Sequence, residues 1–186
     1  MIRAFIAVTL AESVIEEIAK VRTRLQEEKA DVRWTRIESL HLTLKFLGDI
    51  YRHQVEPILA VLQETVSVHP PLRLIAQGIG AFPNVRRPRV LWVGLKGAGL
   101  IELSEAIETA LMPLNFPPED REFTPHLTLG RVRSLRGWDN MLAIVKEHES
   151  TLFGESEVDR VTLYQSDLRP DGARYVSLGS VSFRQA

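Results

Sequence analysis

The tetrapeptide His-Leu-Thr-Leu occurs twice in this chain of 186 residues, beginning at His41 and again at His126. The second copy follows the first by 85 residues, and patterns typical of strands and helices recur at nearly the same interval. Repeats of about 20 to 50 residues indicate solenoids, propellers or arrays. An interval as long as this one instead predicts two similar lobes.

Each half of the chain is expected to contain the order strand, helix, strand, helix, strand. Two-residue alternation with β-branched residues predicts the strands, and apolar residues at intervals of three and four predict the helices. In the first half we expect strands at 3–8, 41–47 and 72–79 and helices at 14–25 and 55–66. In the second half we expect strands at 89–95, 123–132 and 157–165, helices at 100–111 and 138–145, and a last strand at 175–183.

These elements predict an α+β fold with two lobes, each an antiparallel sheet with helices, related by pseudo-twofold symmetry around a central cleft. Prolines, an asparagine and arginines between residues 81 and 89 suit a connection. We therefore expect a single bilobal domain over residues 1–186, with lobes of roughly 1–83 and 84–186. Thr9 and Glu12 have the spacing of a capping box at the start of the first helix.

Histidine and threonine share one face in each copy of the motif. Side chains two residues apart in a strand point the same way, about 7 Å apart. His41 is therefore expected beside Thr43, and His126 beside Thr128, with the intervening leucines in the core. A single histidine on a strand is more often structural than catalytic, but two identical segments at matching places favour a functional pair lining one polar cleft.

The two histidines suit the hydrolysis of a phosphodiester. The attacking water needs a base, the departing oxygen needs an acid, and histidine can serve as either near neutral pH. Threonine hydroxyls and a guanidinium can stabilise the charge that builds on the phosphate oxygens. Arg131 falls on the face opposite His126, so it reaches the site only if the strand bulges, which Gly130 would permit. By the same alternation Phe46 is expected in the core, with base stacking as the alternative.

Composition argues against several other classes of protein. The net charge of −1 does not fit a long nucleic-acid groove, and the absence of cysteine removes disulfides, thiolate metal sites and a cysteine nucleophile. Neither motif has a carboxylate on its own face, so we expect no metal, and no glycine-rich loop indicates a nucleotide cofactor.

No apolar run reaches the roughly 20 residues that span a bilayer, and the N-terminus lacks a signal-peptide pattern. We therefore expect no membrane contact, a cytoplasmic location and a monomer, although no pattern sets the oligomeric state.

Five segments carry a family resemblance that extends over nearly the whole chain. They are RAFIA at 3–7, HLTLKFLG at 41–48 after Trp34, FP at 82–83 with RPRVLW at 87–92, FTPHLTLGR at 123–131, and LYQS at 163–166. With these segments the chain resembles the 2H phosphoesterase superfamily. Within it, the chain looks most like the RNA 2′,3′-cyclic phosphodiesterases, which were first described as 2′–5′ RNA ligases.

The resemblance implies metal-free hydrolysis of a terminal 2′,3′-cyclic phosphate to a 2′-phosphate, with an RNA 3′ end or a cyclic nucleotide as partner. It assigns His126 as the proton acceptor that activates water and His41 as the proton donor to the 3′ oxygen. Thr43 and Thr128 would bind the phosphate, with Arg131 assisting. Two alternatives stay open, namely 2′–5′ RNA joining at the same site and a nucleotide-binding module without turnover. The sequence does not identify the physiological RNA.

Overall fold

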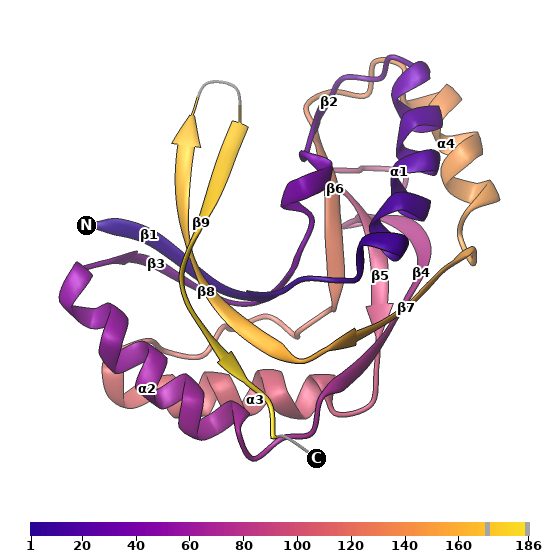
Figure 1. Cartoon of the computed structure of the whole chain (residues 1–186). Helices are drawn as coiled ribbons and strands as arrows, with labels where there is room; N and C mark the ends of the chain where they lie inside the picture. The colour runs from indigo at the N-terminus through magenta and orange to yellow at the C-terminus, as the bar shows by residue number, and fades with distance from the viewer. Residues whose placement is uncertain (170–171, 185–186) are drawn as a thin grey trace.

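The computed structural model describes residues 1–169 and 172–184 and has an α+β architecture built on one strongly curved antiparallel sheet (Figure 1). The strands are β1 (Ile2–Val8), β2 (Val32–Trp34), β3 (Leu42–Ile50), β4 (Leu72–Phe82), β5 (Val90–Lys96), β6 (His126–Val132), β7 (Leu152–Val158), β8 (Arg160–Arg169) and β9 (Gly172–Ser182). The helices are α1 (Glu12–Glu27), α2 (Val55–Val66), α3 (Leu100–Leu111) and α4 (Trp138–Glu147), with short 3₁₀ turns η1 (Ile37–Ser39), η2 (Arg52–Gln54) and η3 (Met112–Leu114).

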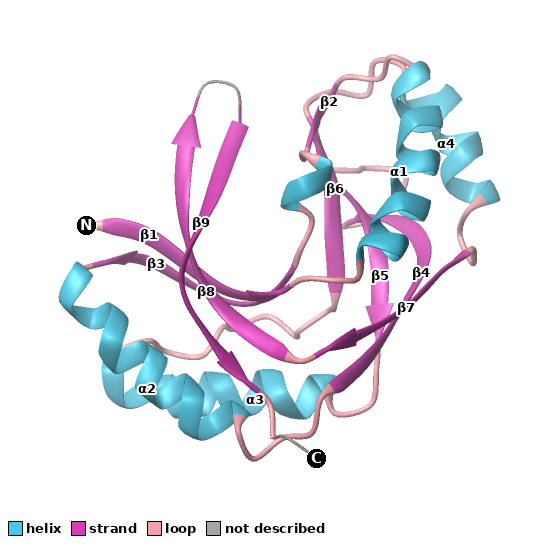
Figure 2. Ribbon diagram, in the orientation of Figure 1, coloured by secondary structure: helices cyan, strands magenta, loops and turns pink. Residues whose placement is uncertain are grey.

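The helices form two pairs that cover different parts of the sheet (Figure 2). Helix α1 packs against β7 and α4, whereas α2 packs against α3 and β9. Each helix buries one apolar stripe, as α1 does with Val14, Ile18, Val21 and Leu25. Full burial of such a side chain contributes about 1.5 to 3 kcal/mol. Within the described part of the chain, no helix combines the length and hydrophobicity that crossing a bilayer requires.

The strand order gives the sheet two matching halves. It runs β7-β4-β5-β6-β3-β1-β8-β9, with β2 added beside β6. Read inward from each edge, β7-β4-β5-β6 corresponds to β9-β8-β1-β3. This arrangement confirms the expected bilobal α+β fold with antiparallel strands.

Each half of the sheet takes strands from both halves of the chain. Strand β4 pairs with β5, and β8 pairs with β1, so the strand that closes each sequence repeat lies in the sheet of the other repeat. Residues 83 and 84 fall in the connection between β4 and β5, which form a hairpin within one half of the sheet. We propose this point as a boundary between sequence repeats and not between the spatial halves.

Three local features of the structure differ from what the sequence predicted. The strand expected at 157–165 is two strands, because β7 ends at Val158 and β8 begins at Arg160. No glycine or proline marks that break, but two consecutive polar residues, Asp159 and Arg160, interrupt the alternation of apolar and polar residues there. The short strand β2 was not predicted. The capping box is also wrong, since α1 has Ala11 as its N-cap without a side-chain cap, and the Ala11 N–H donates to Ser156 Oγ at 2.7 Å.

A buried lysine joins β3 to the second half of the chain. The Lys45 side chain is 2% exposed and forms an ion pair with Glu108 of α3, whose side chain is 18% exposed. Lys45 Nζ also donates to the Pro117 carbonyl at 2.8 Å. A buried charge of this kind is tolerated only when its partners remain in place. The contact therefore fixes β3 against α3 and against the segment that leads to β6.

Replacing Lys45 should destabilise the fold. In Lys45→Ala the Glu108 carboxylate stays largely buried without its partner, so we expect the free energy of unfolding to fall by about 3 kcal/mol. Urea denaturation monitored by circular dichroism measures the change. Lys20→Ala is the matched control, because Lys20 pairs with Glu17 on the exposed surface of α1, where ion pairs contribute little. Equal losses in the two variants would contradict the assigned role of Lys45.

Candidate active site

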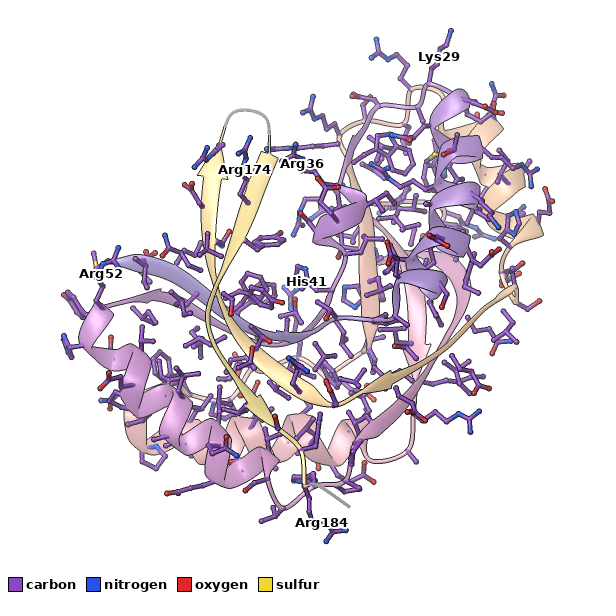
Figure 3. The ribbon with its side chains drawn as sticks, in the orientation of Figure 1. Lys29, Arg36, His41, Arg52, Arg174 and Arg184 are labelled. Atoms are coloured by element: carbon purple, nitrogen blue, oxygen red, sulfur yellow. The ribbon has the colours of Figure 1, made fainter. Side chains whose placement is uncertain are left out.

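The two histidine strands are neighbours in the sheet. Strands β3 and β6 run antiparallel, with Leu42 and Leu127 as Cα partners. In an antiparallel pair the residues on either side of a partner pair also lie across from each other, which places His41 beside Thr128 and Thr43 beside His126. Leu42 and Leu127 are 1% and 0% exposed, so these four polar side chains share the opposite face. The structure thus brings all four motif residues together, with His41 in the hollow of the curved sheet (Figure 3).

Both imidazoles are held by the backbone in the same way. His41 Nδ1 lies 2.7 Å from the Ser39 carbonyl oxygen, and His126 Nδ1 lies 2.6 Å from the Thr124 carbonyl oxygen. A carbonyl oxygen can only accept a hydrogen bond, so Nδ1 carries the hydrogen in each ring. Nε2 is then the atom left with a lone pair in the neutral form. Each histidine is therefore prepared to take up or release a proton at Nε2.

The surroundings of both histidines favour the neutral form. Burial is the main cause that lowers the pKa of His41, and the neighbouring His126 lowers it further, against the opposing effect of the Ser39 hydrogen bond. Burial likewise lowers the pKa of His126, assisted by the positive charge of Arg131 and opposed by its own backbone hydrogen bond. A bound phosphate anion would act in the opposite direction, because a negative charge favours imidazolium.

A bulge in β6 brings Arg131 to the histidine face. Leu91 and Trp92 of β5 are paired with Gly130 and Thr128 of β6, so Leu129 is the extra residue. An extra residue reverses the side that the following residues face. Arg131 is accordingly exposed, and its charge acts on His126. Strand alternation required a bulge if Arg131 was to reach the histidine face. The structure has this bulge at Leu129, one residue before Gly130.

A second bulge lies at the matching place in β3. Ile6 and Ala7 of β1 are paired with Lys45 and Thr43, so Leu44 is the extra residue. Beyond it, Phe46 is 57% exposed. The prediction that Phe46 lies in the core is wrong, because the bulge reverses the alternation on which it was based.

Aromatic rings surround His41. Its ring centroid lies 4.8 Å from that of Phe5 and 4.9 Å from that of Tyr175, which meets it edge-on. Phe5 also stacks on Tyr164 at 5.4 Å and lies 6.2 Å from Phe46. The sequence did not place Tyr164 or Tyr175 near His41. Their strands were predicted, but their closeness to His41 depends on the pairing of β8 with β1 and β9.

A cavity of about 220 Å³ opens beside His41. Tyr164 and Tyr175 form an aromatic part of its wall, and Arg36 and Arg174 also line it. Burial raises the pKa of the Tyr175 hydroxyl, and the Arg131 charge opposes that rise. The site therefore combines two neutral imidazoles with guanidinium groups and an aromatic wall, which is an arrangement suited to a phosphate ester that carries an organic group.

The remaining histidines lie outside this arrangement. His53 is exposed and stacks on Tyr51 with ring centroids 5.5 Å apart. The His148 side chain is 12% exposed, and its Nδ1 lies 3.0 Å from Thr151 Oγ1. Among residues 1–169 and 172–184, no three His, Asp or Glu side chains gather as a metal site.

The chain is similar to several known proteins over almost its whole length. A family model described as LigT like Phosphoesterase matches residues 8–92 and 94–175. A protein of Methanothermobacter thermautotrophicus named RNA 2′,3′-cyclic phosphodiesterase is 32% identical over 178 residues, which cover 95% of this chain and 96% of that one. An Archaeoglobus fulgidus protein of the same name is 36% identical over 177 residues, covering 95% and 97%. The crystal structure of a Thermus thermophilus protein matches with a TM-score of 0.83 at 28% identity and covers 98% of both chains.

The protonation state of the histidine pair can be measured directly. We expect His41 and His126 to titrate below the ordinary histidine value of about 6.5, because both rings are buried. Nitrogen-detected NMR should show hydrogen on Nδ1 in each neutral ring. Inorganic phosphate should raise the pKa of at least one of the two histidines, whereas sodium chloride at equal ionic strength should not. If both histidines had pKa values above about 6.5 without phosphate, burial would not lower these pKa values as we expect.

Proposed function

This chain belongs to the LigT-like phosphoesterase family, and we propose that it hydrolyses the 2′,3′-cyclic phosphate at an RNA 3′ end, leaving a 2′-phosphate. Relatives that align over almost their full length are named for this activity. The observation that carries the proposal is the pair of histidines on adjacent antiparallel strands. Each is fixed through Nδ1 to a backbone carbonyl, which leaves two Nε2 atoms for one phosphorus.

The reaction uses one imidazole on each side of the phosphorus. His126 Nε2 accepts a proton from water while the water oxygen forms a bond to phosphorus. The bond from phosphorus to the 3′ oxygen breaks, and protonated His41 donates its Nε2 proton to that oxygen. The products are a 2′-phosphomonoester and a 3′-hydroxyl. His126 then carries a proton and His41 does not, and exchange with solvent restores the starting state.

The local charges support this division of roles. Burial lowers the pKa of His126 and the Arg131 charge lowers it further, which favours the unprotonated form that a base requires. His41 has to be protonated although its burial favours the neutral form. The phosphate anion supplies the opposing charge, because it stabilises an imidazolium that lies beside it. Protonation of the acid is thus coupled to substrate binding.

Other residues on the same face bind the phosphate and the base. The Thr43 and Thr128 hydroxyls and the Arg131 guanidinium donate to phosphate oxygens, where negative charge increases during attack. Phe46 offers an exposed ring on which a nucleobase can stack.

Loss of either histidine should remove most of the activity. We expect His41→Ala and His126→Ala each to lower kcat on an oligonucleotide with a cyclic-phosphate end at least about 100-fold, measured in EDTA, since each general acid–base role contributes about 10²–10⁴-fold. Phosphorus NMR of the wild-type product identifies the 2′-phosphate. His53→Ala is the control, because His53 is an exposed histidine outside the site.

A modified substrate separates the acid from the base. When sulfur replaces the 3′ oxygen, the leaving thiolate needs no proton, so the His41→Ala defect should largely disappear while the His126→Ala defect remains. Full activity of either single variant on the normal substrate would contradict the two-histidine mechanism. Tight binding of cyclic phosphates by the wild type without turnover would instead indicate a nucleotide-binding module.

The pH dependence follows from the lowered pKa values. The reaction needs neutral His126, so kcat/KM falls as pH decreases through the lower pKa of the pair, and it needs protonated His41, so kcat/KM also falls as pH rises through the upper one. Because both values lie below the ordinary histidine value, we expect the maximum of kcat/KM on the acid side of about pH 6.5. The alkaline limb of the kcat profile should lie at higher pH than that of the kcat/KM profile, because bound phosphate stabilises the imidazolium form of His41. A kcat/KM that still rises at about pH 8 would refute this scheme.

A further inference from the structure

Two arginines from distant parts of the chain line the cavity beside His41. Arg36 precedes η1, and Arg174 lies on β9. Both contribute to the cavity wall that also contains His41. Figure 3 shows Arg36 and Arg174 close together at the opening above His41, one from each side. The mechanism described above assigns no role to either side chain.

The direction of the reaction places the ribose on this side of the site. The acid must contact the 3′ oxygen, so the ribose that carries this oxygen lies next to His41. Water attacks from the side opposite the departing oxygen, which is the side of His126. The cavity lined by Arg36 and Arg174 begins at His41, and it is therefore the space into which the rest of the RNA extends from the terminal ribose.

We infer that Arg36 and Arg174 bind the phosphodiester on the 5′ side of the terminal nucleotide. The inference rests on the proposed function and adds to it a second phosphate subsite. The enzyme then selects an RNA strand that ends in a cyclic phosphate over a free nucleoside 2′,3′-cyclic phosphate.

The charges around the opening favour an anion there. Glu38 also lines the cavity and lies 3.3 Å from Arg36 Nε, so the two guanidinium groups face one carboxylate there. The Glu38 and Arg36 side chains are 70% and 42% exposed, and exposed ion pairs of this kind hold weakly. A phosphate can accept two parallel hydrogen bonds from one guanidinium, which gives a stronger contact than an exposed monodentate pair.

The size of the cavity limits what it can hold. Pockets for drug-sized ligands have volumes of about 300–1,000 Å³, whereas this cavity has about 220 Å³. It accommodates the ribose and its adjoining phosphate, not a folded RNA segment. With a net charge of −1 the chain offers no general attraction for RNA, so the two arginines act as a local contact with one phosphate.

The test compares two substrates that differ by one nucleotide. A nucleoside 2′,3′-cyclic phosphate lacks the 5′ phosphodiester, and a dinucleotide with the same terminal base has it. We expect wild-type kcat/KM to be at least about tenfold higher for the dinucleotide, and Arg36→Gln and Arg174→Gln each to lower this ratio by about tenfold or to abolish it. An uncharged methylphosphonate linkage should remove the preference in the wild type and cause no further loss in the variants.

Arg160→Gln provides the control variant, and two results would overturn the inference. Arg160→Gln should keep the wild-type ratio, because Arg160 lies at the opposite end of the β8–β9 pairing from Arg174. Equal wild-type rates on the two substrates, or equal losses on both in the arginine variants, would overturn the inference. Turnover of the nucleoside cyclic phosphate tests the proposed function separately. If that turnover is present without a dinucleotide preference, only the second subsite is rejected, and if neither substrate reacts, the proposed function fails.

Discussion

The pairing of Leu42 with Leu127 is the contact on which the site depends. These are the central leucines of the two motifs, and they meet as partners at the junction between the two halves of the sheet. Because both are buried, the histidine and threonine that flank each of them must face the other strand's threonine and histidine on the open side. The positions of these histidine and threonine side chains are therefore fixed by hydrophobic burial, which tolerates no shift of register by one residue.

Alternation within the motifs predicted this shared face correctly but failed a few residues further along. His41, Thr43 and the leucines follow the period of two that any strand imposes. Phe46 and Arg131 lie beyond bulges at Leu44 and Leu129. A bulge is defined by the register of the neighbouring strand, and one strand's sequence does not contain that information. Gly130 was the only local sign, and β3 has no glycine at the equivalent position.

The repeat was visible in the sequence, but the exchange of strands between its halves was not. Residues 83–89 form a short connection, and strands joined by a short connection usually pair as antiparallel neighbours. Strand β4 therefore joins β5 in the sheet of the second repeat. The corresponding place beside β1 is taken by β8, which is distant in sequence. This second pairing brings Tyr164 next to Phe5, so the aromatic wall near His41 could not be predicted from any single segment.

A symmetric backbone cannot by itself distinguish an acid from a base, and two side chains supply the difference. Phe46 and Arg131 each follow their histidine by five residues and each lies just beyond a bulge at the same place. At equivalent positions, one half presents an exposed ring and the other a positive charge. Burial lowers the pKa of His126 and the Arg131 charge lowers it further, whereas aromatic rings lie beside His41. We propose that this asymmetry of side chains on a repeated scaffold assigns the roles of acid and base.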